Sequence, residues 1–351
     1  MAFTFKICKK YTYEQHCCIV FRGFRCGKAL ALEEINLVLS ESNVAAARVL
    51  MFDQIPREAA WLAQQASVIV GVSDASGGDQ PHWNADVWVS SLDEAARLRD
   101  RAERNPLAAL LLVQVLRVIE SLPMELALKV ESMAYSVLQA GPEFAAWQEK
   151  IARDLSPEVS QAGGVPLRVN VEGNSLILEL DRPDSRNALD LSLRDALCEV
   201  LEATLLDPDR PRLLLRGLGS CFCVGGDLST FGLFPDPARA HQIRSIRQPG
   251  LLLGRCADRL EAHVHGACIG SGIEMPAFAA KLVAHPKSFF QLPELSMGLI
   301  PGAGGCYSIG RRIGRHRLAW WVLSGRKINA RTALEWGLVD RVDSNSWCGS
   351  A

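Results

Sequence analysis

Residues 167–218 read LRVNVEGNSLILELDRPDSRNALDLSLRDALCEVLEATLLDPDRPRLLLRGL, and this stretch decides the fold. Its apolar spacing predicts two strands and a turn over 167–183, an amphipathic helix over 192–207 and a short buried strand over 212–218. This order is typical of a mostly parallel sheet covered by helices. In such sheets ligands bind beyond the carboxyl ends of the strands, where loops expose backbone N–H groups.

Two glycine-containing loops fit that position. GSCFCVGGDLSTF (219–231) follows the last of these strands, and HGACIGSGIEM (265–275) precedes a helix that we expect to begin near Glu274. Glycine permits backbone angles and close approaches that other residues do not, so such loops can aim N–H groups at a ligand oxygen. Taken singly, each loop equally predicts a plain tight turn between strand and helix.

Four segments together resemble a known family. They are DRPDSRNALD (181–190), FCVGGDL (222–228), HGACIGSGIE (265–274) and LPELSMGLIPGAGG (292–305). Their order and spacing resemble the enoyl-CoA hydratase/isomerase family, the crotonase superfamily, over about residues 167–343. The resemblance implies an α/β fold with a core of repeated ββα units and a CoA thioester as substrate, with no other cofactor and no metal.

The resemblance places an oxyanion hole on two backbone N–H groups, those of Gly226 and Ser271. The family usually has glycine where this chain has Ser271, but the donor is a backbone group and survives the change. Reaction at the α-carbon of a thioester passes through an enolate, whose oxygen gains charge only then. Two preorganised donors therefore stabilise the transition state selectively.

The same comparison implies a path for CoA and the acyl group. Arg186 could pair with a phosphate of CoA, although a solvated surface arginine is an equal interpretation of that residue alone. The predicted substrate-binding positions are Arg186, Ala188, Asp227, Leu228, Ser229 and Gly302.

Two glutamates, Glu274 and Glu294, are the predicted catalytic residues. Glu294 lies in FFQLPELSMG, an apolar run where a carboxyl group is costly unless it is paired or keeps its proton. A retained proton is what a general acid needs near neutral pH. The resemblance implies that Glu294 protonates the substrate α-carbon while Glu274 orients and deprotonates the attacking water.

The chain is predicted to divide into three parts. Residues 1–40 form a basic leader of unknown role, residues 41–160 a mostly helical region, and residues 161–351 the crotonase-like catalytic domain with a shortened C-terminus. The boundary is placed near residue 160 because residues 155–166 have the Ser, Pro and Gly content of a linker.

Within the N-terminal region we expect a helix over residues 44–70 broken at Pro56, and four helices between residues 91 and 150. Their apolar faces, including Tyr135 and Trp147, are interpreted as helix-packing surface. We assign this region no chemistry. Its layout before a crotonase-like domain also resembles a branch that includes a cofactor-independent dioxygenase.

Two departures from the family pattern affect the site. Few residues follow GLVDRV (337–342), so the usual C-terminal lid is absent from the sequence unless the N-terminal helices replace it. Pro276 is tolerated only in the first turn of a helix, which predicts a helix start near Glu274.

The composition of the chain limits the kinds of partner that it can bind. The 38 Lys and Arg balance 39 Asp and Glu, so the global positive field of a nucleic-acid-binding protein is missing. No apolar run has the roughly 20 residues of a membrane span, and the N-terminus lacks a secretory pattern. Eleven scattered cysteines fit a reducing compartment. We therefore expect a cytoplasmic protein that binds neither nucleic acid nor membrane. The family resemblance implies a homo-oligomer.

The principal hypothesis is hydration or isomerisation of a 2-enoyl-CoA. Thioester hydrolysis, decarboxylation, cofactor-independent oxygenation and a noncatalytic scaffold remain alternatives. A nucleophilic Cys221 or Cys223 with His241 as base, and a metal held by His263 and His265, are weaker hypotheses.

Overall fold

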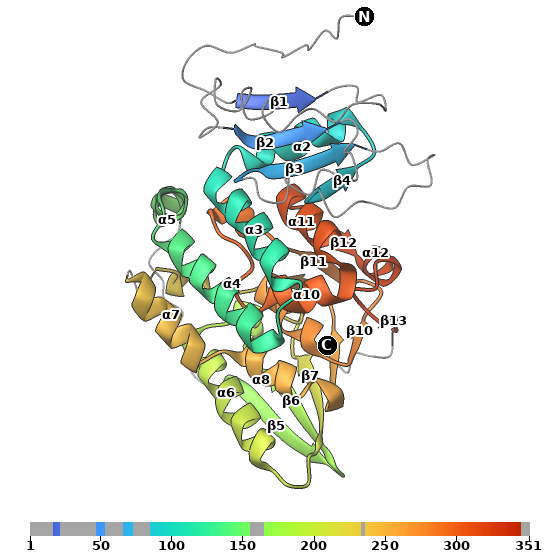
Figure 1. Cartoon of the computed structure of the whole chain (residues 1–351). Helices are drawn as coiled ribbons and strands as arrows, with labels where there is room; N and C mark the ends of the chain where they lie inside the picture. The colour runs from blue at the N-terminus through green and yellow to red at the C-terminus, as the bar shows by residue number, and fades with distance from the viewer. Residues whose placement is uncertain are drawn as a thin grey trace, which may run out of the picture.

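The structure is a computed structural model that describes residues 17–21, 47–52, 66–72, 85–154, 165–232 and 236–344. A small sheet with helix α2 lies at one end of the molecule and a larger α/β core at the other, with helices α3 and α4 along the core (Figure 1). The expected α/β class and the helical segment before the core are both confirmed.

The core contains a six-stranded sheet in the order β13-β10-β8-β7-β6-β5. Strand β5 is antiparallel to β6, and the remaining pairs are parallel. The strands are β5 (Leu167–Glu172), β6 (Ser175–Leu180), β7 (Arg212–Gly217), β8 (Leu260–Val264), β10 (Lys281–Ala284) and β13 (Arg341–Val342). The hairpin and the following strand confirm the expectation for residues 167–218.

Helix α6 (Leu191–Leu206) joins β6 to β7 and also confirms the sequence pattern. Asp190 caps it, since its Oδ1 accepts a hydrogen bond of 2.7 Å from Leu193 N. The helix buries Leu193, Leu197 and Leu201, which share one helical face. Helices α7 (Pro237–Ile246) and α8 (Pro249–Arg255) then lead to β8.

A second, three-stranded sheet sets the two predicted catalytic glutamates side by side. Strand β9 (Ala267–Ile269) pairs in parallel with β11 (Phe289–Gln291), which also pairs with β12 (Ile328–Asn329). Helix α9 (Ser271–Glu274) follows β9, and the 3₁₀ turn η7 (Glu294–Met297) follows β11. Because parallel neighbours end at the same edge, both glutamates are delivered there.

The first turn of α9 begins at Ser271, three residues before the start expected near Glu274. Pro276 instead opens the 3₁₀ turn η6 (Pro276–Phe278), which ends the helical segment after one turn. The remaining core helices are α10 (Gly305–Ile313), α11 (Arg315–Ser324) and α12 (Ala330–Glu335).

The helix expected over residues 44–70 is wrong. The described part of this stretch holds two strands of a parallel four-stranded sheet instead. The alanine-rich composition favoured a helix in the sequence analysis. However, all five residues of VIVGV are buried, and its β-branched side chains favour a buried strand. Tertiary packing therefore outweighs the weak helical propensity of this stretch. The strands are β1 (Cys17–Phe21), β2 (Ala47–Phe52), β3 (Val68–Val72) and β4 (Val87–Val89). Most of the predicted leader, and the boundary near residue 160, lie outside the described residues.

The four helices expected after residue 91 are confirmed. They are α2 (Leu92–Ala102), α3 (Pro106–Ile119), α4 (Met124–Gln139) and α5 (Pro142–Asp154). Ser91 Oγ accepts from Glu94 N at 3.2 Å, which is the predicted cap. Within the described ranges no helix has the length and apolarity to cross a membrane.

Buried contacts fix these helices to the core. Asp86, just before β4, pairs with Arg117 of α3 at 2.6 Å and with Arg315 of α11 at 3.8 Å. Helix α4 packs against α7, α8 and α10, and α5 packs against η7. Because α10 also packs against α9, helices α4 and α5 cover the edge of the core where α9 and η7 lie.

Candidate active site

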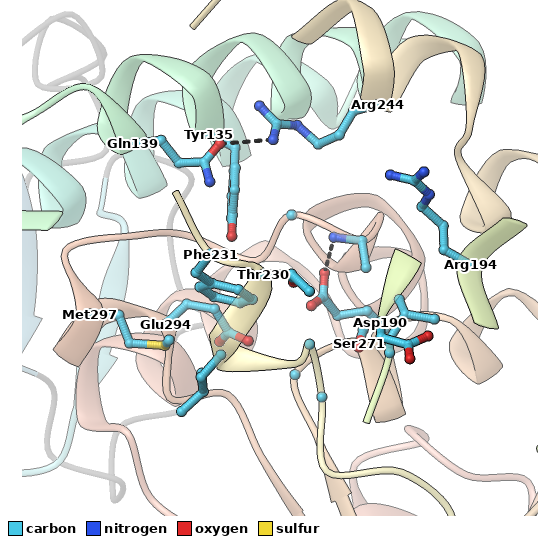
Figure 2. A pocket seen from close by; sticks show the side chains of 18 of the residues that line it. Tyr135, Gln139, Asp190, Arg194, Thr230, Phe231, Arg244, Ser271, Glu294 and Met297 are labelled. Carbon is cyan, nitrogen blue, oxygen red and sulfur yellow. Dashed lines mark hydrogen bonds between the residues drawn. The ribbon is translucent and has the colours of Figure 1, made fainter. Parts of the chain in front are cut away.

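A cavity of about 230 Å³ opens at this covered edge, and segments far apart in sequence line it (Figure 2). Helices α4, α6 and α7 supply one part of the wall. The loops after β7, β9 and β11 supply the other, including both predicted catalytic glutamates and both predicted oxyanion donors. The structure thus brings Gly226, Ser271, Glu274 and Glu294 together around one cavity.

The N–H groups of Gly226 and Ser271 have no acceptor among the described residues. Leu189 N donates to Gly225 O at 2.8 Å, and Asp227 N donates to Leu189 O at 3.1 Å. This pairing uses the residues on both sides of Gly226 and leaves its own N–H unused. Ser271 is the first residue of α9, where an N–H has no partner within the helix.

Glycines let these two loops meet. Gly225 has φ +99°, and a Cβ there would lie 2.9 Å from the carbonyl oxygen of Ile269. Gly270, just before α9, has φ +52°. Both angles belong to the left-handed region that disfavours side chains, so the close approach of the loops depends on glycine.

Glu274 is buried, and its Oε2 accepts hydrogen bonds from Ala303 N at 2.7 Å and Gly305 N at 2.9 Å. Burial raises the pKa of Glu274 to about 7, against the opposing effect of these backbone donors. Its ionised form is therefore accessible near neutral pH, as a general base requires.

Glu294 is also buried, and no hydrogen-bond partner is found for its Oε2 in the described part of the chain. Its Oε1 would lie 2.8 Å from a Cβ placed on Gly270, so the carboxyl group lies directly beside the second loop. Burial and then the neighbouring Glu274 raise the pKa of Glu294 well above its ordinary value. This environment favours the protonated form of Glu294.

A third carboxyl group, that of Glu131 in α4, completes this arrangement. Its Oε1 accepts from Gly304 N at 2.7 Å and its Oε2 from Cys306 N at 2.9 Å. Four successive N–H groups, from residue 303 to residue 306, thus alternate between Glu274 and Glu131 at the start of α10. Burial and then Glu274 raise the pKa of Glu131 to about 8.

Tyr135, one turn beyond Glu131, lines the cavity, so its interpretation as packing surface alone is wrong. A Cβ on Gly302 would overlap its ring, which shows how closely α4 approaches the glycine loop. Burial raises the pKa of Tyr135, so its hydroxyl remains a donor. Trp147 of α5 does pack as interpreted, with its ring centroid 5.5 Å from that of Phe144.

Sequence reasoning therefore missed the contribution of α4. The available signal was Glu131 itself, which is four residues from Ala127 and three from Leu128 on the buried face of that helix. A carboxyl group on an apolar stripe is costly unless it has partners. Gln139 of α4, Arg194 of α6 and Arg244 of α7 also line the cavity and were not predicted.

The predicted substrate-path residues fall into two groups. Leu228 and Gly302 line the cavity. Arg186 is exposed, with φ +54°, and does not line it. Ala188, Asp227 and Ser229 are likewise absent from the wall, and Asp227 Oδ1 accepts from Ser229 N at 2.9 Å.

The two weaker hypotheses gain no support from the described residues, among which no hydrogen bond joins His241 to Cys221 or Cys223. Burial raises the pKa of Cys221 and takes that of Cys223 to about 12, which keeps both thiols protonated. His241 contacts Ser132 Oγ at 3.0 Å, and His263 contacts Glu261 Oε1 at 2.6 Å. Across the described ranges, no group of three or more His, Cys, Asp or Glu side chains could hold a metal ion.

Comparisons with known proteins identify relatives of this chain. The family model described as enoyl-CoA hydratase/isomerase matches residues 172–347. The chain is 33% identical over 176 residues to a 2,3-dehydroadipyl-CoA hydratase of Escherichia coli, covering 50% of this chain and 68% of the relative. It is 30% identical over 180 residues to an enoyl-CoA isomerase/hydratase of Mycosarcoma maydis, covering 49% and 66%.

The matched part spans about two thirds of the length of these relatives. Among solved structures, an enoyl-CoA hydratase from Thermoplasma volcanium aligns with a TM-score of 0.46 and 28% identity. That alignment covers 52% of this chain and 73% of the other.

Proposed function

Because this chain belongs to the enoyl-CoA hydratase/isomerase family, we propose that it adds water across the double bond of a 2-enoyl-CoA thioester. The observation that carries the proposal is that one cavity contains both hydrogen-bond donors for the thioester oxygen and a carboxyl group for proton transfer. Two backbone N–H groups that have no acceptor within the described ranges lie there, together with the buried carboxyl group of Glu294. Polar groups left unsatisfied in a buried site are costly unless a ligand uses them.

The proposed reaction starts with the thioester oxygen accepting from Gly226 N and Ser271 N. Glu274 takes a proton from water as the water oxygen bonds to the β-carbon. As this bond forms, the electron pair of the double bond shifts between the α-carbon and the carbonyl carbon, and the carbonyl electron pair moves onto the thioester oxygen to give an enolate. Glu294 protonates the α-carbon, the thioester carbonyl reforms, and solvent returns the proton from Glu274 to Glu294.

The environments of the two carboxyl groups support these roles. Glu274 accepts hydrogen bonds from backbone N–H groups and has a pKa of about 7, so it is partly ionised near neutral pH. Glu294 lacks such a partner for its Oε2 among the described residues, and burial followed by the neighbouring Glu274 raises its pKa well above the ordinary value. Neighbouring carboxyl groups in different environments are the usual arrangement of a base and an acid.

The direct test is to follow the absorbance of the conjugated thioester in crotonyl-CoA and in longer and aromatic 2-enoyl-CoAs. Hydration removes the conjugation, so we expect the absorbance to fall and 3-hydroxyacyl-CoA to accumulate. Intact protein that binds CoA thioesters but consumes none of the panel would contradict the proposal.

Glu131 is proposed as a positioning residue that acts through Glu274. It shares the four N–H groups at the start of α10 with Glu274, so the two carboxyl groups compete for one stabilised negative charge. In the Glu131→Gln variant only Glu274 can take that charge. We expect the ascending limb of the pH profile of kcat/KM to move to lower pH.

A second readout of Glu131→Gln is the pH dependence of the free energy of unfolding. The folded pKa of Glu131, about 8, lies above the ordinary 4.5, so the folded chain holds a proton that the unfolded chain releases. Its stabilising contribution is complete below pH 4.5 and is lost as the pH rises towards 8. The variant should lack this fall, which is about 1.4 kcal/mol per pH unit.

Glu125→Gln is the matched control, because Glu125 is exposed on the same helix. It should keep the wild-type pH profile and the wild-type slope. The positioning role is wrong if Glu131→Gln also keeps both.

A further inference from the structure

The guanidinium group of Arg244 lies between α7 and α4, and in the part of the chain that the structure describes it donates only to neutral acceptors. Its Nη1 donates to Gln139 Oε1 at 2.8 Å and its Nε to Ser132 Oγ at 3.2 Å. Its Nη2 donates to Ser136 Oγ. These three acceptors lie along one face of α4, four and three residues apart.

No carboxylate of the described residues lies within ion-pair distance of Arg244, although the side chain is largely buried and lines the cavity. Burial lowers the pKa of Arg244, as expected for a cation removed from water. A guanidinium group has five N–H donors, and three are used. The site therefore offers a positive charge and spare donors to whatever enters the cavity.

The contacts of Tyr135 show how the charge of Arg244 lies relative to the proposed catalytic residues. The Arg244 guanidinium lies 4.7 Å from the centroid of the Tyr135 ring. That ring lies against Gly302. The next residue, Ala303, donates its N–H to the carboxyl group of Glu274. One aromatic ring thus separates Arg244 from the loop that positions the base.

At this location Arg244 is better placed to bind the acyl group of the substrate than the phosphates of CoA. The whole pantetheine arm separates those phosphates from the thioester. Figure 2 shows Arg194 of α6 on another part of the wall, apart from the pair formed by Arg244 and Tyr135. The hydroxyl of Tyr135 points into the cavity at the end of the ring away from Arg244 (Figure 2).

We propose that Arg244 binds a carboxylate at the far end of the acyl group. The preferred substrates are then CoA monothioesters of dicarboxylic acids. The placement of the thioester in this argument rests on the proposed function. The planar guanidinium group matches a carboxylate in two parallel hydrogen bonds, which a neutral acyl end cannot provide.

The test compares the binding of saturated thioesters by calorimetry, with adipyl-CoA against hexanoyl-CoA and glutaryl-CoA against pentanoyl-CoA. Saturated ligands cannot be hydrated, so the result does not depend on turnover. We expect the wild-type chain to bind at least one dicarboxylic member about tenfold to a hundredfold more tightly than its neutral partner. Arg244→Gln should remove this preference, and Arg244→Lys should retain part of it.

Arg239→Gln is the matched control, because Arg239 lies on the same helix and is exposed. It removes the same charge and should keep the wild-type preference. An equal loss of affinity for dicarboxylic and neutral thioesters in Arg244→Gln would mean that Arg244 only clamps α7 to α4. Weaker binding of free CoA by the same factor would assign Arg244 to a phosphate, and either result overturns the proposal.

Failure of this inference is distinguishable from failure of the proposed function. If the wild-type chain hydrates crotonyl-CoA but shows no preference in the binding series, the proposed function stands and the carboxylate subsite is wrong. If the chain prefers dicarboxylic thioesters but hydrates no 2-enoyl-CoA, the subsite stands and the proposed reaction is wrong.

Discussion

Glu294→Gln is expected to lower kcat for hydration by about a hundredfold to ten-thousandfold. Gln has nearly the shape of a protonated glutamate but cannot release a proton to the α-carbon. Because Glu294 is buried and holds its proton, the neutral replacement adds no new charge to the cavity. The affinity for saturated acyl-CoA and the melting temperature should stay close to wild type.

The control for this variant is Glu335→Gln, which removes an exposed carboxylate from α12. It should leave kcat unchanged. If Glu294→Gln retains half or more of the wild-type kcat, Glu294 is not the proton donor.

Ser271→Pro is expected to lower kcat by about a hundredfold to a thousandfold. Proline has no N–H, so the change removes one of the two proposed oxyanion donors. Ser271 occupies the first position of α9, where proline is well tolerated and where no protein acceptor loses a hydrogen bond. The measured effect should therefore appear in turnover rather than in thermal stability.

Ser271→Ala separates the backbone donor from the side chain. It keeps the N–H and removes only the hydroxyl, so kcat should stay within a few fold of wild type. Equal losses in the alanine and proline variants would assign the effect to the hydroxyl or to the shape of the cavity. That result would contradict the oxyanion role of the Ser271 N–H.

The part of the site formed by nearby segments could be predicted from the sequence. Gly226, Ser271, Glu274 and Glu294 lie in short segments placed at the ends of β7, β9 and β11. The family resemblance of the four motifs predicted these positions, and the structure places all four residues around one cavity.

The contribution of α4 could not be predicted in the same way. Glu131 acts on backbone groups 173 and 175 residues later in the chain, and Arg244 contacts residues more than 100 positions earlier. These contacts depend on how α4 docks on the core, and helical periodicity shows only that a face is buried. It does not show what covers that face.

The N-terminal strands were missed for a related reason. Residues 47–52 carry Ala, Leu and Met, which favour helix, yet they form β2 between two parallel partners. Pairing with strands distant in sequence decides the state of such a segment, and intrinsic propensity is too weak to reveal it.

Helix α4 gives the site a distinctive organisation. It covers the cavity and also supplies Glu131 to the start of α10 and Tyr135 to the wall. In the proposed mechanism the N-terminal helices therefore act on the pKa of the base and on substrate choice. This interpretation replaces the expectation that the region carries no chemistry.

The central claim is that the chain hydrates a 2-enoyl-CoA by acid and base catalysis. The most direct test is turnover in heavy water enriched in a heavy oxygen isotope, with the product analysed by mass spectrometry. The proposed mechanism predicts heavy oxygen on the β-carbon and one deuteron on the α-carbon of 3-hydroxyacyl-CoA. A shifted double bond without heavy oxygen would indicate isomerisation, and heavy oxygen in a free carboxylate would indicate hydrolysis; either result would contradict the claim.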